Sequence, residues 1–263
     1  MGRSFQNICY TVFLLFYSVS CLAQSPAENK YTQAAVASAH PLATQAGIAI
    51  LQQGGNAFDA AIAVTAVLAV VEPYSSGIGG GGFYLLHQAE SDSHVMIDAR
   101  ERAPLRAHSG LYLDENGEVI PGASITGASS AGIPGIPAAL VHMADKYGNL
   151  KLADSLEPAI THATEGFPVD AYYQRMAGFR LKDLQNNKAA SELFLQQGEV
   201  PELGYKVIQK DLAKTLKAIA TSGFSGFYEN ELAWQMVRDV RRNGGIWTMK
   251  DLATYQVKER SPD

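Results

Sequence analysis

The pattern of hydrophobic and polar residues along this chain predicts many helices and few strands. Apolar residues recur at helical spacing in several long segments, whereas the alternation typical of a strand is short and rare. The predicted helices cover residues 41–53, 59–71, 138–147, 154–165, 170–187, 211–222 and 230–243, with a short one opening at residue 248. The clearest strands cover residues 31–39, 83–87 and 94–99. This mixture indicates an α/β fold of the layered α+β kind.

The centre of this pattern is the segment from residue 59 to residue 102. Its helix is apolar almost all round, as a buried helix would be, and Asn56 is placed to cap it. Pro73 ends the helix, because proline disfavours helical backbone at the residue before it. Five glycines follow between residues 77 and 82, and then two strands joined by a polar turn. Arg100 lies where the second strand leaves the sheet.

Capping residues support several of the other boundaries. Asp154 is expected to cap the helix that it begins, with Pro158 tolerated in the first turn. Thr248 and Asp251 have the spacing of a capping box, which opens the short last helix. Residues 105–131 are rich in turn-forming residues and are expected to be mostly loop. No internal repeat or domain boundary follows from the pattern.

The composition fits an ordinary globular protein. The chain has 263 residues, 47% of them hydrophobic and 18% charged, which is enough for a sizeable core. The net charge of −5 gives no support for a nucleic-acid partner. Residues 24–30 read as a polar linker, and residues 31–263 as one folded region.

The first 23 residues are predicted to be a signal peptide. Arg3 makes the start weakly positive, residues 8–23 are apolar without a charge, and residues 21–23 (Cys-Leu-Ala) resemble a cleavage site. The apolar run of about 16 residues is shorter than the ~20 that span a membrane, so an uncleaved anchor is the weaker alternative. A lipoprotein signal is disfavoured because Ser18 stands where that pattern has leucine. We expect a periplasmic or secreted protein without a stable membrane span.

Removal of this leader would also remove Cys9 and Cys21, the only two cysteines. Neither disulfides nor thiol chemistry would then remain. Several other chemistries also lack their motif. Residues 127–132 miss the spacing of a G-x-S-x-G nucleophile motif, and no P-loop lysine follows the glycine run. No metal-ligand spacing is found among the histidines, which are His40, His87, His94, His108, His142 and His162. No metal or cofactor is therefore expected.

Two features have both a structural and a functional interpretation. The glycines at 77–82 either let a helix and a strand pack closely, or line a pocket with backbone N–H groups. Arg100 either pairs with Asp98 or Glu101 at the surface, or binds a carboxylate through two parallel hydrogen bonds. The residues alone favour the structural interpretation of both features, and Arg102 is expected to be solvated.

Several sequence blocks, in this order, resemble the γ-glutamyltranspeptidase family, also called glutathione hydrolases. They are residues 37–44, 54–61, 71–73, 77–83, 98–104 (with the pattern D-x-R-E-x-A-P), 132–135, and 243–245 with 251–252. The resemblance extends over roughly residues 31–262, and several specific blocks in one order are a strong signal.

The resemblance implies a fold and a site. It implies the N-terminal, large-subunit portion of an αββα N-terminal nucleophile hydrolase sandwich, incomplete without a C-terminal half. Arg100 would bind the α-carboxylate of a γ-glutamyl group, and the glycine loop would shape the substrate cleft. The family's nucleophile is a threonine exposed when the precursor (a zymogen) cleaves itself. Thr161-His162 is the nearest match, but it falls inside a predicted helix and is rejected. No catalytic residue is therefore assigned in this chain.

The implied function is that of an exported γ-glutamyltransferase, a hydrolase and acyltransferase of glutathione metabolism. It would cleave γ-glutamyl amides and pass the γ-glutamyl group to water or an acceptor amine. Glutathione or another γ-glutamyl compound would be its substrate, and a C-terminal small subunit from the same precursor its partner. The chain alone is expected to be inactive. The alternatives are a related amidohydrolase such as a cephalosporin acylase, or a non-catalytic remnant that binds carboxylates.

Overall fold

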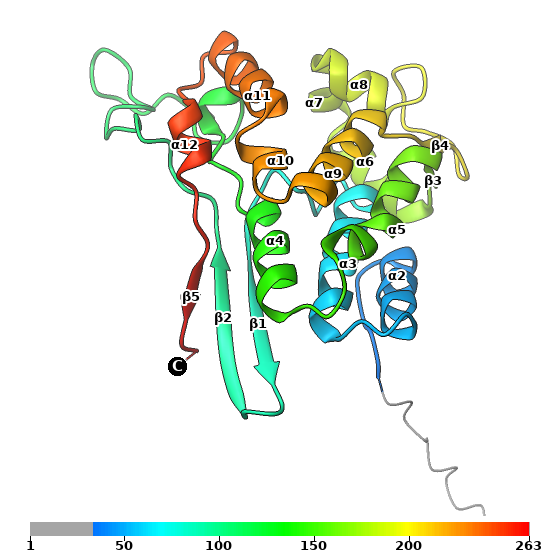
Figure 1. Ribbon diagram of the computed structural model, residues 1–263. Helices are drawn as coiled ribbons and strands as arrows, with labels where there is room; N and C mark the ends of the chain where they lie inside the picture. The colour runs from blue at the N-terminus through cyan, green and yellow to red at the C-terminus, as the bar shows by residue number, and fades with distance from the viewer. Residues whose placement is uncertain (1–33, 263) are drawn as a thin grey trace, which may run out of the picture. The chain divides into compact units, whose positions relative to one another are not determined.

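A pair of helices opens the part of the chain, residues 34–262, that this computed structural model describes. They are α2 (Pro41–Gln52) and α3 (Ala57–Val71), which pack side by side (Figure 1). Asn56 caps α3 as predicted: its Oδ1 accepts hydrogen bonds from the N–H groups of Phe58 and Asp59 at 2.8 and 3.0 Å. Asp59 returns the interaction by accepting from the Asn56 N–H at 2.9 Å, so the capping box is complete.

Three more helices extend this core. α4 (Ile136–Tyr147) and α5 (Leu152–Glu165) pack against α3, and α9 (Lys210–Ser222) packs against α5. The expected cap of α5 was wrong: the helix begins at Leu152, after Lys151, and Asp154 lies in its first turn. A carboxylate there still interacts favourably with the positive end of the helix dipole. Pro158 consequently lies further inside the helix than predicted.

The predicted helix over residues 170–187 is divided in two. Asp170 caps α6 (Ala171–Phe179) by accepting from the Tyr173 N–H at 2.7 Å. Arg180 has φ −109° and ψ 9°, which interrupts the helix before α7 (Leu181–Asn186). A further short helix, α8 (Lys188–Phe194), follows. Gly178 lies two residues before the interruption, where its low helix propensity weakens the helix.

The main sheet has three antiparallel strands in the order β1-β2-β5. The predicted hairpin forms β1 (Gly82–Gln88) and β2 (Ser93–Ala99), with Gly82 opposite Ala99. The third strand, β5 (Lys258–Arg260), pairs with β2 and brings the end of the chain beside the hairpin (Figure 1). A separate two-stranded sheet joins β3 (Phe167–Pro168) to β4 (Lys206–Val207).

The two faces of the main sheet differ in burial. Leu86, Ile97 and Ala99 are buried on the face toward the core, and α4 packs against β2. On the opposite face, Phe83 is 58% exposed and Leu85 is 67% exposed. An antiparallel sheet normally keeps apolar residues on a covered face. Phe83 and Leu85 are therefore an exposed apolar part of a face that also carries Asp98 and Arg260.

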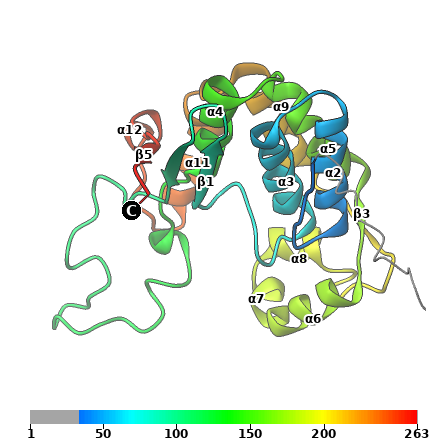
Figure 2. The ribbon, with the colours of Figure 1, turned by 90° about the horizontal axis from the view of Figure 1, so that it is seen from below.

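A long loop joins β2 to α4. It extends away from the helices (Figure 2), and η1 (Ala128–Ser130) is the one helical element in it. After α9 come α10 (Ser225–Tyr228), α11 (Glu231–Arg242) and α12 (Met249–Ala253). The predicted capping box of α12 is confirmed, because Asp251 accepts from the Thr248 N–H at 2.6 Å.

One predicted strand is absent. Residues 34–38 have no regular secondary structure, so the described part of the strand expected at 31–39 was wrong. The predicted signal peptide at 1–23 and linker at 24–30 lie outside the described residues. Within residues 34–262, no helix is both long and apolar enough to cross a membrane.

The contact between β5 and α4 predicts a dependence of stability on pH. Hydrogen bonds from Lys146 (2.5 Å), Tyr147 (2.6 Å) and His142 (2.8 Å) lower the pKa of Glu259 to about 2 from its ordinary 4.5. A lowered pKa in the folded state means that the carboxylate stabilises the fold above pH 4.5 and loses this effect as the pH falls toward 2.

We expect Glu259→Gln to reduce the free energy of unfolding by on the order of 1 kcal/mol at neutral pH, since the carboxylate is partly exposed. The difference from the parent protein should disappear as the pH approaches 2. Chemical unfolding between pH 2 and pH 7 measures it. Glu192→Gln removes an exposed carboxylate 3.8 Å from Lys188 and serves as the control. A Glu259→Gln loss that is the same at every pH would contradict the prediction.

Candidate functional site

Arg100 lies directly after β2, and its side chain is 55% exposed. Its guanidinium is 3.1 Å from a carboxylate oxygen of Glu101. Asp98, the other expected partner, accepts from the Arg100 backbone N–H at 3.1 Å and forms its ion pair with Arg260. Those two contacts, first the backbone N–H and then Arg260, lower the pKa of Asp98. Because a partly exposed ion pair contributes little stability, a ligand carboxylate can compete with Glu101 for Arg100.

The glycine loop at 77–82 packs directly beneath Arg100 and Glu101. A Cβ on Gly81 would lie 2.5 Å from the Glu101 nitrogen and 2.6 Å from the Ala99 oxygen, so only glycine permits this approach. The carbonyl of Gly80 accepts hydrogen bonds from the N–H groups of Gly135 and Ile136 at 2.8 and 3.1 Å. Hydrogen bonds thus hold the loop before β1 against the start of α4, and close packing at Gly81 holds the loop against Glu101.

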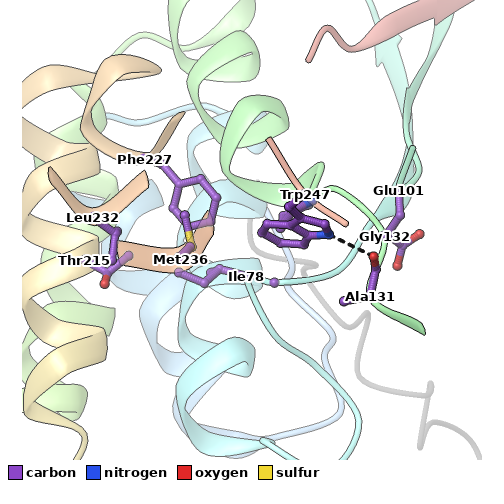
Figure 3. Close-up of a pocket in the computed structure, with 11 residues that line it drawn as sticks. Ile78, Glu101, Ala131, Gly132, Thr215, Phe227, Leu232, Met236 and Trp247 are labelled. Carbon is purple, nitrogen blue, oxygen red and sulfur yellow. Dashed lines mark hydrogen bonds between the residues drawn. The ribbon is translucent and has the colours of Figure 1, made fainter. Parts of the chain in front are cut away.

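Two cavities lie on either side of Glu101. The first has a volume of about 350 Å³ and apolar walls contributed by Ile78, Phe227, Leu232, Met236 and Trp247. Figure 3 shows Trp247 in this cavity, held by a hydrogen bond from its ring nitrogen to the Ala131 carbonyl at 2.9 Å.

The second cavity has a volume of about 320 Å³ and is lined by Gly77, Gly80 and Gly81 of the loop, together with Ser75 and Ser76. Glu101 lines both cavities. The glycine loop therefore serves both interpretations of its sequence, close packing at Gly81 and the lining of a cavity.

Arg102 is not solvated, contrary to the prediction from sequence. Its guanidinium donates to the backbone carbonyls of Asp251 and Thr254 at 2.8 and 2.9 Å, and to the Thr254 hydroxyl at 2.8 Å. Its own backbone forms a two-way bridge with Ile133. The partners of the guanidinium lie about 150 residues away along the chain, beyond the reach of any local pattern. Arg102 therefore fixes α12 against the segment that carries Arg100.

A pair of tyrosines supports the same segment. The Tyr255 hydroxyl donates to the Arg100 carbonyl at 2.8 Å, and its ring stacks on Tyr228 at 5.7 Å between centroids. The Tyr228 hydroxyl in turn donates to the Pro134 carbonyl at 2.9 Å. We did not predict these residues. The sequence feature nearest to them is the capping box of α12, a short helix that ends two residues before Tyr255.

The other residues considered in the sequence have structural roles. His40 caps α2, with its Nδ1 accepting from the Leu42 N–H at 3.1 Å, and burial lowers its pKa. Thr161 lies inside α5 as expected, where its hydroxyl donates to Glu157 at 2.7 Å. Within residues 34–262, no group of three His, Cys, Asp or Glu side chains is arranged to hold a metal ion. The site thus offers a cationic group, Arg100, paired with Glu101, which lines two cavities.

Comparisons with known proteins match this site and its surroundings. The sequence pattern of the family described as Gamma-glutamyltranspeptidase matches residues 43–262. The glutathione hydrolase proenzyme of Pseudomonas sp. strain A14 is 38% identical over 94% of this chain and 42% of its own length. That of Bacillus subtilis strain 168 is 40% identical over 86% of this chain and 39% of its own length. The chain thus spans about two fifths of the length of these relatives.

Solved structures give the same result. The γ-glutamyltranspeptidase of Helicobacter pylori superposes with a TM-score of 0.85 at 39% identity, over 88% of this chain and 66% of that one. A cephalosporin acylase from Bacillus halodurans superposes with a TM-score of 0.72 at 30% identity, over 92% of this chain and 47% of that one. Since the family pattern matches most of the sequence, this chain belongs to the γ-glutamyltranspeptidase family.

Proposed function

We propose that this chain is the substrate-gripping portion of an exported glutathione hydrolase that cleaves γ-glutamyl amides. The observation that carries the proposal is Arg100. Its guanidinium is half exposed at the end of β2, in the D-A-R-E block that resembles the family's α-carboxylate site. Its neighbour Glu101 lies against the glycine loop and lines two cavities. Membership of a family whose relatives are named glutathione hydrolase proenzymes supports the choice of substrate.

In the proposed reaction, Arg100 holds the α-carboxylate of the γ-glutamyl group through two parallel hydrogen bonds. This fixes the γ-carbonyl carbon for attack by a threonine hydroxyl that a further portion of the precursor supplies. The threonine's own amine accepts the hydroxyl proton and passes it to the leaving amine as the C–N bond breaks. Water or an acceptor amine then attacks the resulting γ-glutamyl ester and releases the threonine.

The sheet supports a second part of the proposal, the αββα sandwich. Phe83 and Leu85 make the outer face of β1 apolar and more than half exposed. A second sheet from the remaining portion of the precursor would cover this face, as two sheets packed face to face do. The partner would be the small subunit formed when the precursor cleaves itself.

A related activity remains the second candidate. The likeness to a cephalosporin acylase favours hydrolysis of a different amide on the same scaffold. The position of Arg100 favours a γ-glutamyl substrate over another amide, because the α-carboxylate of the γ-glutamyl group gives the guanidinium an ionic partner.

The experiment that tests the function compares this chain with a complete precursor that contains it. We expect the precursor, expressed with its own leader, to hydrolyse γ-glutamyl p-nitroanilide in the periplasmic or extracellular fraction. The 263-residue chain alone should release no product and should be poorly soluble, because its apolar sheet face is uncovered. Turnover by this chain alone, or a precursor that prefers a cephalosporin amide, would overturn the proposal.

A further inference from the structure

The support beneath Arg100 is unusually specific for a residue at the end of a strand. Each polar atom of the Arg100 backbone has its own partner: the N–H donates to Asp98 at 3.1 Å, and the carbonyl accepts from Tyr255 at 2.8 Å. The carbonyl belongs to the peptide group that joins Arg100 to Glu101. The orientation of this peptide group sets the direction in which both side chains leave the backbone.

The tyrosine that holds this carbonyl is itself firmly placed. Tyr255 is 3% exposed and stacks on Tyr228, which is completely buried. Burial, with the carboxylates of Asp98 and Glu101 nearby, raises the pKa of Tyr255 to about 12, so its hydroxyl remains a donor at neutral pH. A side chain at Gly135 would collide with the Tyr255 hydroxyl and with the Ala99 carbonyl. The absence of a side chain at Gly135 thus leaves the space that the Tyr255 hydroxyl occupies.

The same hydroxyl connects Arg100 to the glycine loop. Gly135, whose Cα the hydroxyl approaches, donates its N–H to the Gly80 carbonyl at 2.8 Å. Gly81, the next residue of the loop, lies against Glu101. The Tyr255 hydroxyl therefore lies where the Arg100 segment, the turn before α4 and the glycine loop meet.

We propose that Tyr255 is a positioning residue, whose hydroxyl orients the Arg100–Glu101 peptide so that the Arg100 guanidinium faces the substrate carboxylate. This proposal rests on the role proposed above for Arg100. It adds a residue about 150 positions further along the chain and makes a specific statement about kinetics. Loss of the hydroxyl should weaken the binding of substrates that carry the α-carboxylate, and of those alone.

Tyr255→Phe in the complete enzyme is the direct test, because it removes the hydroxyl and keeps the ring on Tyr228. We expect the KM for γ-glutamyl p-nitroanilide to rise roughly threefold to tenfold, the effect of one neutral hydrogen bond. The kcat should stay within about twofold, since the contact acts in both ground and transition states. For 4-aminobutyryl p-nitroanilide, which lacks only the α-carboxylate, the KM should not change.

Tyr173→Phe is the matched control. Tyr173 is also 3% exposed and donates its hydroxyl to a backbone carbonyl, that of Phe194, at 2.9 Å, but it lies in α6. It should show a comparable loss of thermal stability without the change in KM. Equal KM effects from the two variants would overturn the proposal. So would a Tyr255→Phe enzyme that fails to fold while Tyr173→Phe folds, because the hydroxyl would then serve the whole fold.

Arg100→Lys, assayed beside these variants, separates this proposal from the function on which it rests. If Arg100→Lys weakens only the substrate with the carboxylate and Tyr255→Phe does not, the positioning role alone is wrong. If neither variant distinguishes the two substrates, the role of Arg100 is wrong as well. In the double variant, Tyr255→Phe should add no further loss of carboxylate discrimination, because the bidentate contact is already absent.

Discussion

Arg100→Lys is expected to lower kcat/KM for γ-glutamyl p-nitroanilide on the order of tenfold to a hundredfold or more, although the positive charge is kept. An arginine fork matches a planar carboxylate through two parallel hydrogen bonds, and an ammonium group retains one of them. Hydrogen bonds to charged groups contribute roughly 1.5–3 kcal/mol each, which corresponds to this range. If the contact is equally strong in ground and transition states, the loss appears mainly in KM.

Stability should hardly change, because the Arg100 side chain is 55% exposed and a lysine can still pair with Glu101. The measurement is steady-state kinetics with γ-glutamyl and 4-aminobutyryl p-nitroanilides. The second substrate lacks the carboxylate and should be insensitive to the change.

Arg260→Lys provides a matched control for Arg100→Lys. Arg260 lies on β5 and also grips a carboxylate with two nitrogens, since it donates to Asp98 at 2.7 and 2.8 Å. Both bonds go to one oxygen of Asp98, and the replacement removes this contact within the fold, so it should leave the ratio of the two substrates unchanged. Equal losses on both substrates for Arg100→Lys would show that Arg100 is structural and would refute the proposed binding site.

Asp59→Ala is expected to reduce the free energy of unfolding of the complete protein by about 3–5 kcal/mol. Asp59 is completely buried. One carboxylate oxygen accepts from the N–H groups of Asn56 and Asn149, both at 2.9 Å, and the other accepts from Leu150 at 3.3 Å. Alanine would leave these partly buried N–H groups without their acceptor, which costs more than the bonds themselves contributed.

The effect extends beyond the cap of α3. Asn149 and Leu150 belong to the turn between α4 and α5, so Asp59 joins the start of α3 to that turn. Urea unfolding of both proteins gives the difference. Asp211→Ala, which removes an exposed first-turn aspartate of α9, should change stability by less than about 0.5 kcal/mol. A loss from Asp59→Ala as small as that would show that water or a local shift replaces the carboxylate.

Features determined by neighbouring residues could be predicted from the sequence. The box formed by Asn56 and Asp59 uses residues three apart, and the hairpin of β1 and β2 uses alternation and a short turn. The box at Thr248 and Asp251 has the same local origin. Each pattern contains all of its partners within a few residues, so the sequence states the interaction completely.

Within the candidate site, the sequence pointed to Arg100 as the proposed binding residue but not to what surrounds it. The D-A-R-E block identified Arg100, and the glycine run identified the loop beside it. The exposure of the Arg100 side chain, its pairing with Glu101 rather than Asp98, and the two cavities required the packed structure. The ion pair of Asp98 was taken by Arg260, 162 residues away in the sequence.

The prediction for Arg102 was wrong for a tertiary reason. Arg102 was expected to be solvated because the resemblance assigned it no role, yet Asp251 in α12 and Thr254 at its end supply three acceptors. The interruption at Arg180 has a local origin instead, because Gly178 lies two residues before it. By itself, the sequence determined most of the longer helices and the hairpin, because those rest on local spacing, and its ordered motif blocks indicated the family and singled out Arg100. Only the tertiary structure decided which distant residues hold Arg100 in place, because hydrogen bonds between residues 150 positions apart leave no periodic trace in the chain.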